Sequence, residues 1–388
     1  MATFFLCMIY AAFISLGLPD SLLGAAWPAM QPALGVPLDS AGVLSMIVAG
    51  GTVVASLSAD RMLHRFGTGR VTLVSVTMTA CALLGYALAP GFWWLALAAV
   101  PMGLGAGAVD AGLNNFVALH YEARHMSWLH CFWGVGAIIS PFIMSFALKN
   151  LNWNSGYRIV GFIQPAIALL LLVTLPVWKI NKTESTADTK RVGLTAALKI
   201  KGVPFLLIGF FAYCAAEATA MYWASTYFTE VKGISGDRAA SFAALFYIGI
   251  TLGRFASGFI TERLGDRRMI LLGTGILACG IMILLIPVQS YMTAFAAFLV
   301  IGFGCAPIYP CIIHSTPANF GAENSGAIIG IQMASAYVGS TFIPPLFGLF
   351  GNAVGFSVMP VYLLAFFALM IIMTEATFRI TGKPGGKN

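Results

Sequence analysis

Two short stretches, ADRMLHRFGTGR at 59–70 and GFITERLGDRR at 258–268, decide the fold of this chain. Each follows an apolar run, and each joins an acid to an arginine before a glycine and further arginines: Asp60 to Arg61 and Glu262 to Arg263. The two acids lie 202 positions apart in a chain of 388 residues. A motif that returns at about half of the chain length indicates an internal repeat.

Other features recur at nearly the same distance. Gly103-Leu104-Gly105 matches Gly302-Phe303-Gly304 at an offset of 199. Further pairs at offsets of 197 to 202 are Asp20 with Glu217, Asp110 with Tyr309, and His130 with Gln332. A nearly constant offset is hard to obtain by chance, so we expect two structurally similar halves, as in many transporter folds.

The composition places both halves in a membrane. Hydrophobic residues make up 59% of the chain and charged residues 9%, whereas soluble domains have roughly 45–50% and about 25%. The mean hydropathy is +0.88. The seven cysteines include no CxxC pair, which argues against a zinc site or a disulfide framework. This composition excludes a cytoplasmic enzyme, a secreted disulfide-rich module and a disordered chain.

Twelve apolar stretches are long enough to cross a bilayer as helices, which takes about 20 residues. The predicted spans are 4–27, 40–60, 70–90, 93–118, 127–149, 156–179, 203–229, 238–261, 268–288, 291–314, 325–350 and 355–379. We therefore predict an all-α membrane protein with twelve transmembrane helices. The polar segment after 179 divides it into a six-helix bundle at 1–179, a cytoplasmic linker at 180–202 and a second bundle at 203–388.

Lysines and arginines set the orientation. With the N-terminus inside, sixteen of them fall on the cytoplasmic side and four on the outer side, while Arg254 lies within a span. Both termini are then cytoplasmic, and the net charge of +7 reflects topology rather than nucleic-acid binding. We expect a multi-pass protein of the cell (plasma or inner) membrane.

At this point the whole chain resembles the major facilitator superfamily, with twelve helices, a central linker and the acid-arginine-glycine-arginine signature after spans two and eight. The first copy departs from the family form at Ser56, where glycine is usual. The resemblance implies that the signature acts as a gate latch, in which an acid near a helix end pairs with arginine. The gating residues predicted in this way are Asp60, Arg61, Arg65, Arg70, Arg254, Glu262, Arg263, Arg267 and Arg268.

Three acids lie inside predicted spans: Asp20, Asp110 and Glu217. A charge in mid-bilayer costs about 2.5–3.5 kcal/mol even on the lenient insertion scale, so such residues mark cavities or proton paths. A rise of about 1.5 Å per residue places Asp20 in the outer half, Asp110 in the inner half and Glu217 near the middle. We predict that all three couple transport to protons. The alternative is that they are buried acids with hydrogen bonds inside the helix bundle.

The residues around these acids extend the resemblance to one group within the superfamily. Asp20 follows Gly17-Leu18-Pro19, and Asp110 lies in a glycine-rich run, four residues before Asn114. These segments, with 129–137 and 213–227, resemble the fucose:proton symporter group and its sugar-transporting relatives. The resemblance implies that an acid in span one and an acid in span four serve protonation and sugar binding.

Aromatic faces and amides in the same spans fit a sugar, which stacks on rings and takes paired hydrogen bonds. The candidate substrate-binding residues are Trp27, Asn114, His130, Trp133, Gln164, Trp223, Tyr247, Tyr309, Gln332 and Tyr337. Taken singly, each is equally typical of a membrane interface or of contacts between helices.

Three functions compete. The first is a proton-coupled symporter of a sugar or sugar-like polar solute, in which two halves rock about a central cavity. The second is a proton-driven exporter of drugs or small molecules, whose span-five signature is half present because Ser140 stands before Pro141 in place of glycine. The third is a membrane enzyme or a non-transporting scaffold. The sequence contains no motif for a catalytic nucleophile, a metal site or phosphate binding that would support an enzyme. We predict the symporter, acting as a monomer, with no enzymatic activity, no cofactor, no metal and no nucleic-acid partner.

Overall fold

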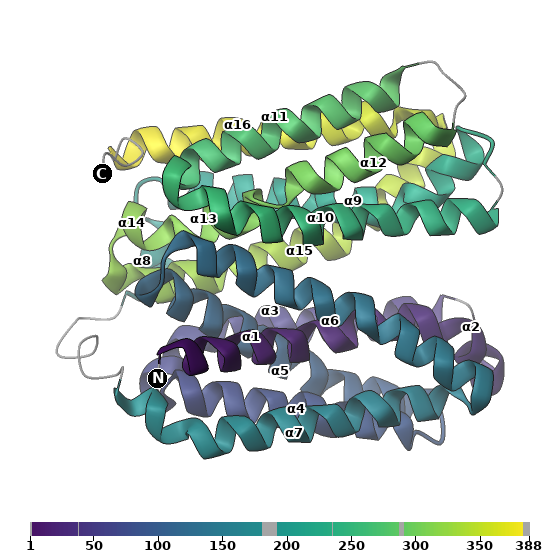
Figure 1. Cartoon of the computed structure of the whole chain (residues 1–388), viewed down its shortest axis with the longest axis horizontal. Coiled ribbons are helices and arrows are strands. Elements are labelled where there is room, and N and C mark those ends of the chain that lie inside the picture. The colour runs from purple at the N-terminus through teal and green to yellow at the C-terminus, as the bar shows by residue number, and fades with distance from the viewer. Residues whose placement is uncertain (1, 38, 181–191, 235, 287–290, 383–388) are drawn as a thin grey trace. The chain divides into compact units, whose positions relative to one another are not determined.

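The computed structural model describes residues 2–37, 39–180, 192–234, 236–286 and 291–382, and these residues form helices joined by short turns (Figure 1). By contacts the chain divides into unit 1, residues 1–116 and 132–191, and unit 2, residues 117–131 and 192–388. The dividing point after 191 falls inside the predicted linker, of which 181–191 lie outside the described residues. The predicted bundles at 1–179 and 203–388 stay a prediction.

Unit 1 holds the first seven helices. They are α1 (Ala2–Asp20), α2 (Leu22–Leu34), α3 (Ser40–Phe66), α4 (Thr68–Ala87), α5 (Phe92–His120), α6 (Ala123–Asn150) and α7 (Trp153–Ile180). The end of α5 and the start of α6, residues 117–131, belong to unit 2. Helices α1 and α2 together form one span-length element with a break at Ser21, next to Pro19.

Unit 2 holds the other helices. They are α8 (Leu194–Leu198), α9 (Val203–Glu230), α10 (Gly236–Leu264), α11 (Asp266–Leu285), α12 (Tyr291–Cys305), α13 (Ile308–His314), α14 (Thr316–Phe320), α15 (Ala322–Val354) and α16 (Met359–Thr381), with the short 3₁₀ turn η1 (Phe356–Val358) before α16. The stretch predicted as one span at 291–314 is broken between α12 and α13, where Pro307 cannot donate a backbone hydrogen bond.

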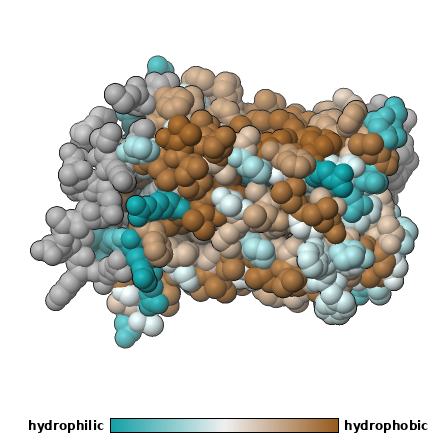
Figure 2. All heavy atoms as spheres, turned by 90° about the horizontal axis from the view of Figure 1, so that it is seen from below, coloured by the Kyte–Doolittle hydropathy of each residue, from teal (hydrophilic) through white to brown (hydrophobic). Residues whose placement is uncertain are grey.

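The predicted twelve-helix membrane fold is confirmed. Among the described residues, eleven helical segments are long and apolar enough to cross a membrane, and α10, with 29 residues, is long enough to be the twelfth. Large apolar side chains point outward, such as Phe142 at 72% and Val173 at 70% exposure, as expected where lipid replaces water. Figure 2 shows one face on which apolar side chains fill the broad middle and hydrophilic ones gather toward the two ends.

Glycines repeat the same helix contacts in both units. A Cβ at Gly103 on α5 would meet the carbonyl oxygen of Val48 on α3, and a Cβ at Gly302 on α12 would meet that of Phe246 on α10. The partners in the two units are again about 200 residues apart. Small residues let helix backbones touch in membranes, where side-chain burial gives no hydrophobic gain. The sequence repeat is thus a repeat of packing within each unit.

Candidate functional site

In unit 1, the break between α1 and α2 presents the exposed carboxylate of Asp20. The indole Nε1 of Trp133, on α6, donates a hydrogen bond to Asp20 Oδ2 over 2.7 Å. Two glycines bring these helices together, because Gly17 lies against the backbone of Trp133 and Gly136 lies against that of Ile14. The sequence-predicted Asp20 and Trp133 therefore form one pair of an accessible acid and an aromatic ring.

Asp110, on α5 in the same unit, is enclosed. Its residue is 4% exposed on α5, and Asn114 Nδ2 donates to its Oδ1 over 2.8 Å and to its main-chain oxygen over 3.0 Å. The four-residue spacing puts both side chains on one helix face, as predicted. The amide of Asn114 thus binds both the side chain and the main chain of Asp110.

Two other predicted residues of unit 1 pack helices together. Gln164 on α7 donates to the carbonyl oxygen of Ser15 over 2.7 Å and accepts from the Ser15 hydroxyl. Trp27 is 7% exposed and lies in an apolar cluster with Leu22 and Tyr86. In this conformation both side chains are occupied by structural contacts.

In unit 2, Glu217 and Arg254 come together although they were assigned to different tasks. Arg254 Nη2 lies 3.7 Å from Glu217 Oε1, and its Nη1 donates to the carbonyl oxygen of His130 over 3.4 Å. The Tyr213 hydroxyl lies 3.0 Å from Glu217 Oε1 and 2.9 Å from the carbonyl oxygen of Cys305. Arg254 is 3% exposed, so this acid-base pair is buried.

Aromatic residues adjoin this pair. The His130 ring meets Tyr309 edge to face at 4.8 Å between centroids, and the Tyr309 hydroxyl reaches Met333 Sδ at 3.4 Å. Gln332 is fully buried and accepts from Thr316 over 3.1 Å, while no hydrogen-bond partner faces its Nε2 among the described residues.

The remaining residues predicted to bind the solute are Trp223, Tyr247 and Tyr337. Trp223 Nε1 donates to the Pro344 carbonyl oxygen over 2.7 Å, and its ring lies against Gly348. Tyr247 on α10 and Tyr337 on α15 are half-buried. In the part of the chain that is described, no three histidine, cysteine or acidic side chains cluster as a metal site would require.

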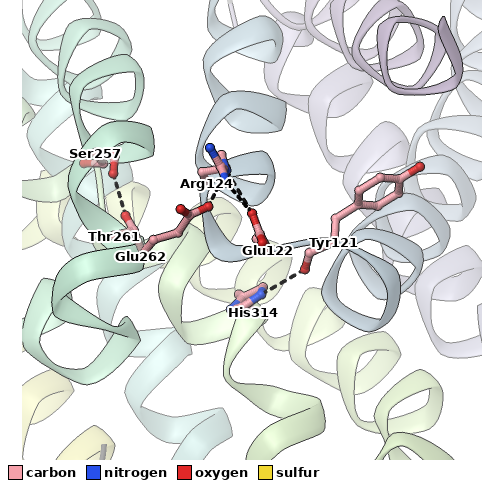
Figure 3. A network of polar contacts seen from close by, with 7 residues as sticks. All are labelled: Tyr121, Glu122, Arg124, Ser257, Thr261, Glu262 and His314. Atoms are coloured by element: carbon pink, nitrogen blue, oxygen red, sulfur yellow. Dashed lines mark hydrogen bonds and ion pairs between the residues drawn. The ribbon is translucent and has the colours of Figure 1, made fainter. Parts of the chain in front are cut away.

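A charged cluster surrounds the second copy of the signature (Figure 3). Arg124, at the start of α6, bonds Glu122 through Nε at 3.0 Å and Nη2 at 2.6 Å, and it also contacts Glu262 at the end of α10. His314 Nδ1 lies 2.8 Å from Asp266 Oδ2, and His314 Nε2 lies 3.2 Å from the Tyr121 carbonyl oxygen. Hydrogen bonds from the Arg124 guanidinium hold the pKa of Glu122 below its ordinary value.

The other predicted gating residues divide between the two turns. Arg267 bonds both oxygens of Glu375 on α16, at 3.0 and 2.5 Å. In the first copy, Asp60 Oδ1 lies 3.4 Å from His64 on its own helix. The remaining predicted gating arginines are exposed: Arg61, Arg65, Arg70, Arg263 and Arg268. Arg254 is paired with Glu217 rather than located at either turn.

Several residues of these clusters were not predicted, among them Tyr213, Arg124, His314 and Glu375. Tyr213 carried a usable signal, because it precedes Glu217 by four residues and so shares its helix face. Besides the bond from Arg124 to the nearby Glu122, the other three meet partners 48 to 193 positions away, and no local pattern indicates such contacts.

The chain is similar to known proteins in both sequence and fold. A sequence profile described as "Major Facilitator Superfamily" matches residues 9–244 and 206–388. "Bypass of stop codon protein 6" of Saccharomyces cerevisiae is 24% identical, over 91% of this chain and 78% of that protein. The glucose/mannose transporter of Bacillus subtilis is 23% identical, over 87% of this chain and 86% of that protein. The crystal structure of the E. coli fucose:proton symporter superposes with a TM-score of 0.79 and 17% identity, covering 98% of both chains.

Proposed function

Because this chain belongs to the major facilitator superfamily, we propose that it is a secondary active transporter that carries a sugar or related polar solute together with protons. The superfamily makes it a transporter. The solute class, the proton and the direction of movement are the proposal.

The pair of Asp20 and Trp133 carries the sugar assignment. A sugar offers hydroxyl donors to a carboxylate and an apolar C–H face to an indole ring, and binding sites fix orientation with few such polar groups. Here an exposed acid and an aromatic ring, 2.7 Å apart through the indole nitrogen, adjoin a helix break. Broken helices form the solute sites of many transporters. The names of the glucose/mannose and fucose relatives support the same class.

The proton assignment rests on Asp110 and Glu217. Ionisable residues in membrane spans are expensive and belong to proton relays in pumps and transporters. Asp110 is buried with Asn114 as its neighbour, and Glu217 is beside Tyr213 and Arg254. The neighbouring groups of both acids can form hydrogen bonds with either the protonated or the ionised carboxyl group.

The Arg124 cluster supports a latch. It ties residues 121–124, between α5 and α6, to α10 and α13 through Glu262 and His314. Partly exposed ion pairs are worth about 0–1 kcal/mol each, so they part easily during a transport cycle. The bias of lysine and arginine supports placing this cluster and both termini on the cytoplasmic side of the cell membrane.

Uptake into proteoliposomes tests the proposal. The purified protein is reconstituted, and accumulation of D-glucose, D-mannose and L-fucose is measured with and without an inward proton gradient. Asp110→Asn should abolish gradient-driven accumulation, because the amide carries no proton, and it should keep counterflow of the same sugar. Asp39→Asn, which changes an exposed carboxyl outside the spans, should do neither. Undiminished accumulation by Asp110→Asn would remove the proton role of this residue.

A second variant tests the solute site. Trp133→Phe keeps an aromatic face but loses the hydrogen bond to Asp20, so the half-saturation constant for the transported sugar should rise about tenfold, the equivalent of about 1.4 kcal/mol. An unchanged constant would contradict a shared site. Proton movement driven by lipophilic cations, with no sugar uptake, would favour an exporter instead.

A further inference from the structure

We propose that unit 1 carries a binding site for an anionic phospholipid, in a groove between α6 and α7. The groove has a volume of about 390 Å³, and its lining residues are all apolar: Ile139, Phe142, Ile143 and Phe146 from α6, and Ile159 from α7. All of them belong to unit 1. The site is separate from the groups to which solute and proton binding are assigned above.

One stripe of α6 forms a wall of the groove and ends in a lysine. Ile139, Phe142, Phe146 and Lys149 follow one another at spacings of three, four and three residues, which places them on one face of the helix. Phe142 and Phe146 are 72% and 60% exposed, so this face is open to the surrounding lipid. From Ile139 to Phe146 the helix rises about 10 Å, which is enough to contact part of an acyl chain.

A second basic residue stands at the same end of the groove. Arg158 lies on α7 next to Ile159, and only two residues connect α6 to α7, so Lys149 and Arg158 lie at the ends of the helices that this connection joins. Gly156 lets the start of α7 pack against Met144 on α6, because a Cβ there would meet that side chain. Lys149 and Arg158 are exposed, and neither makes a hydrogen bond or an ion pair with another described residue.

The charges of Lys149 and Arg158 fit the phosphate of a lipid headgroup. They are two of the four basic residues that the predicted orientation places on the outer side, where lysine and arginine are otherwise avoided. A guanidinium binds phosphate through two parallel hydrogen bonds, and an ammonium group binds it as a compact charge. A phospholipid whose phosphate meets these two residues has its acyl chains directed along the apolar groove.

A second copy of the chain fits this surface less well than a lipid. Helix interfaces in membranes are rich in small residues that let backbones approach, whereas this groove is lined by isoleucine and phenylalanine. A symmetric interface uses the same patch on both copies. It would bring Lys149 and Arg158 of one copy close to the same residues of the other, and like charges repel.

Native mass spectrometry of the purified full chain in detergent tests the site. Dioleoyl phosphatidylglycerol, which is anionic, and dioleoyl phosphatidylcholine, which has the same chains and no net charge, are titrated separately, and the apparent Kd of the first bound lipid is measured. The wild type should bind the anionic lipid more tightly. Lys149→Gln combined with Arg158→Gln should weaken that binding about 25-fold, because each basic residue near a headgroup contributes about fivefold. Binding of phosphatidylcholine should not change.

Matched variants separate the headgroup from the acyl chain. Lys199→Gln combined with Lys201→Gln removes two exposed lysines of unit 2 and should leave the first anionic lipid bound as before. Ile159→Trp fills the groove and should weaken the binding of both lipids. Leu172→Trp, at a position that is exposed on the same helix and outside the groove, should weaken neither.

Melting temperatures without added lipid check that each variant is folded, and Ile143→Phe replaces Ile159→Trp if the latter is not. Equal affinity of the wild type for the two lipids would overturn the site, as would an unchanged Kd in the variant that lacks Lys149 and Arg158. Release of the anionic lipid by inorganic phosphate alone would show a phosphate site without a lipid groove. Loss of a dimer in Ile159→Trp, with lipid binding unchanged, would assign the groove to a second copy instead.

Discussion

The turn between α3 and α4 and the turn between α10 and α11 have the same backbone conformation but different neighbouring residues. Gly67 has φ 82° and ψ 152°, Gly265 has φ 78° and ψ 159°, and each amide donates to the carbonyl oxygen four residues earlier, at 2.8 and 2.7 Å. Around the first turn, Asp60 pairs with His64 of its own helix. The second turn reaches α6, α13 and α16 through Glu262, Asp266 and Arg267.

This difference separates two properties of the signature. The glycine and its hydrogen bond set the path of the chain, and they do so in both copies. The charges do not determine their own partners, because these depend on which helix ends lie nearby. The same motif therefore forms a local turn in one unit and a multi-helix junction in the other.

The largest expected effect tests the shared backbone. Gly67→Ala and Gly265→Ala each place a Cβ in a region of φ and ψ that is essentially restricted to glycine, and each should lower the free energy of unfolding by about 1–3 kcal/mol. Titration with a denaturing detergent measures this. Gly42→Ala and Gly275→Ala, at open positions inside α3 and α11, are the controls and should be neutral or stabilising. Unequal losses at 67 and 265 would break the equivalence of the turns.

A smaller effect tests the different neighbours. His314→Gln should cost about 0.5–1.5 kcal/mol, because His314 links Asp266 to the Tyr121 carbonyl oxygen and glutamine keeps at most one of these bonds. His64→Gln should cost less than about 0.5 kcal/mol, since it removes one pair within a helix. Faster amide hydrogen exchange over residues 117–131 should accompany the first substitution and not the second. Equal losses in the free energy of unfolding for the two variants would contradict the larger role of the second turn in joining helices.

The smallest effect concerns pH. Since hydrogen bonds from Arg124 lower the pKa of Glu122, this residue favours the folded state above the unfolded pKa of about 4.3, and the contribution is lost as the pH falls through the lower folded value. Wild type should therefore be slightly more stable than Glu122→Gln at pH 7, and the two should converge below about pH 4. Melting curves across that range measure it. A gap that widens in acid would mean that Glu122 is not paired in this way.

Much of the fold was predictable because it depends on local and periodic features. Runs of apolar residues place most spans within a few residues, although the first continues to Leu34 and the second to Phe66, beyond their predicted ends at 27 and 60. The repeated glycines predict two similar halves. The two breaks differ in this respect. Gly17 and Pro19 predict a weakened helix near Asp20. The apolar residues around Ile308 predict a continuous helix instead, so the break there is not indicated by the sequence.

The candidate sites were less predictable because their contacts join distant segments. Asp20 and Trp133 were each selected, yet their hydrogen bond spans 113 positions and depends on how α1 crosses α6. Asp110 and Asn114 were predicted as a pair because their spacing follows the helix period. Arg254 is predicted as a gating residue, and its contact with Glu217 depends on the packing of α9 on α10, which no local pattern indicates.

The glycine crossings also bear on how each unit deforms. Where Gly103 meets Val48, and Gly302 meets Phe246, backbone lies on backbone and no side chain stands between them to change rotamer. If one helix of such a pair tilts, the other must tilt with it, because close-packed atoms transmit strain and no flexible side chain lies between the two backbones. Each unit should therefore contain one helix pair that moves as a rigid body, α3 with α5 and α10 with α12. Bending should then occur at the helix breaks at Ser21 and Pro307.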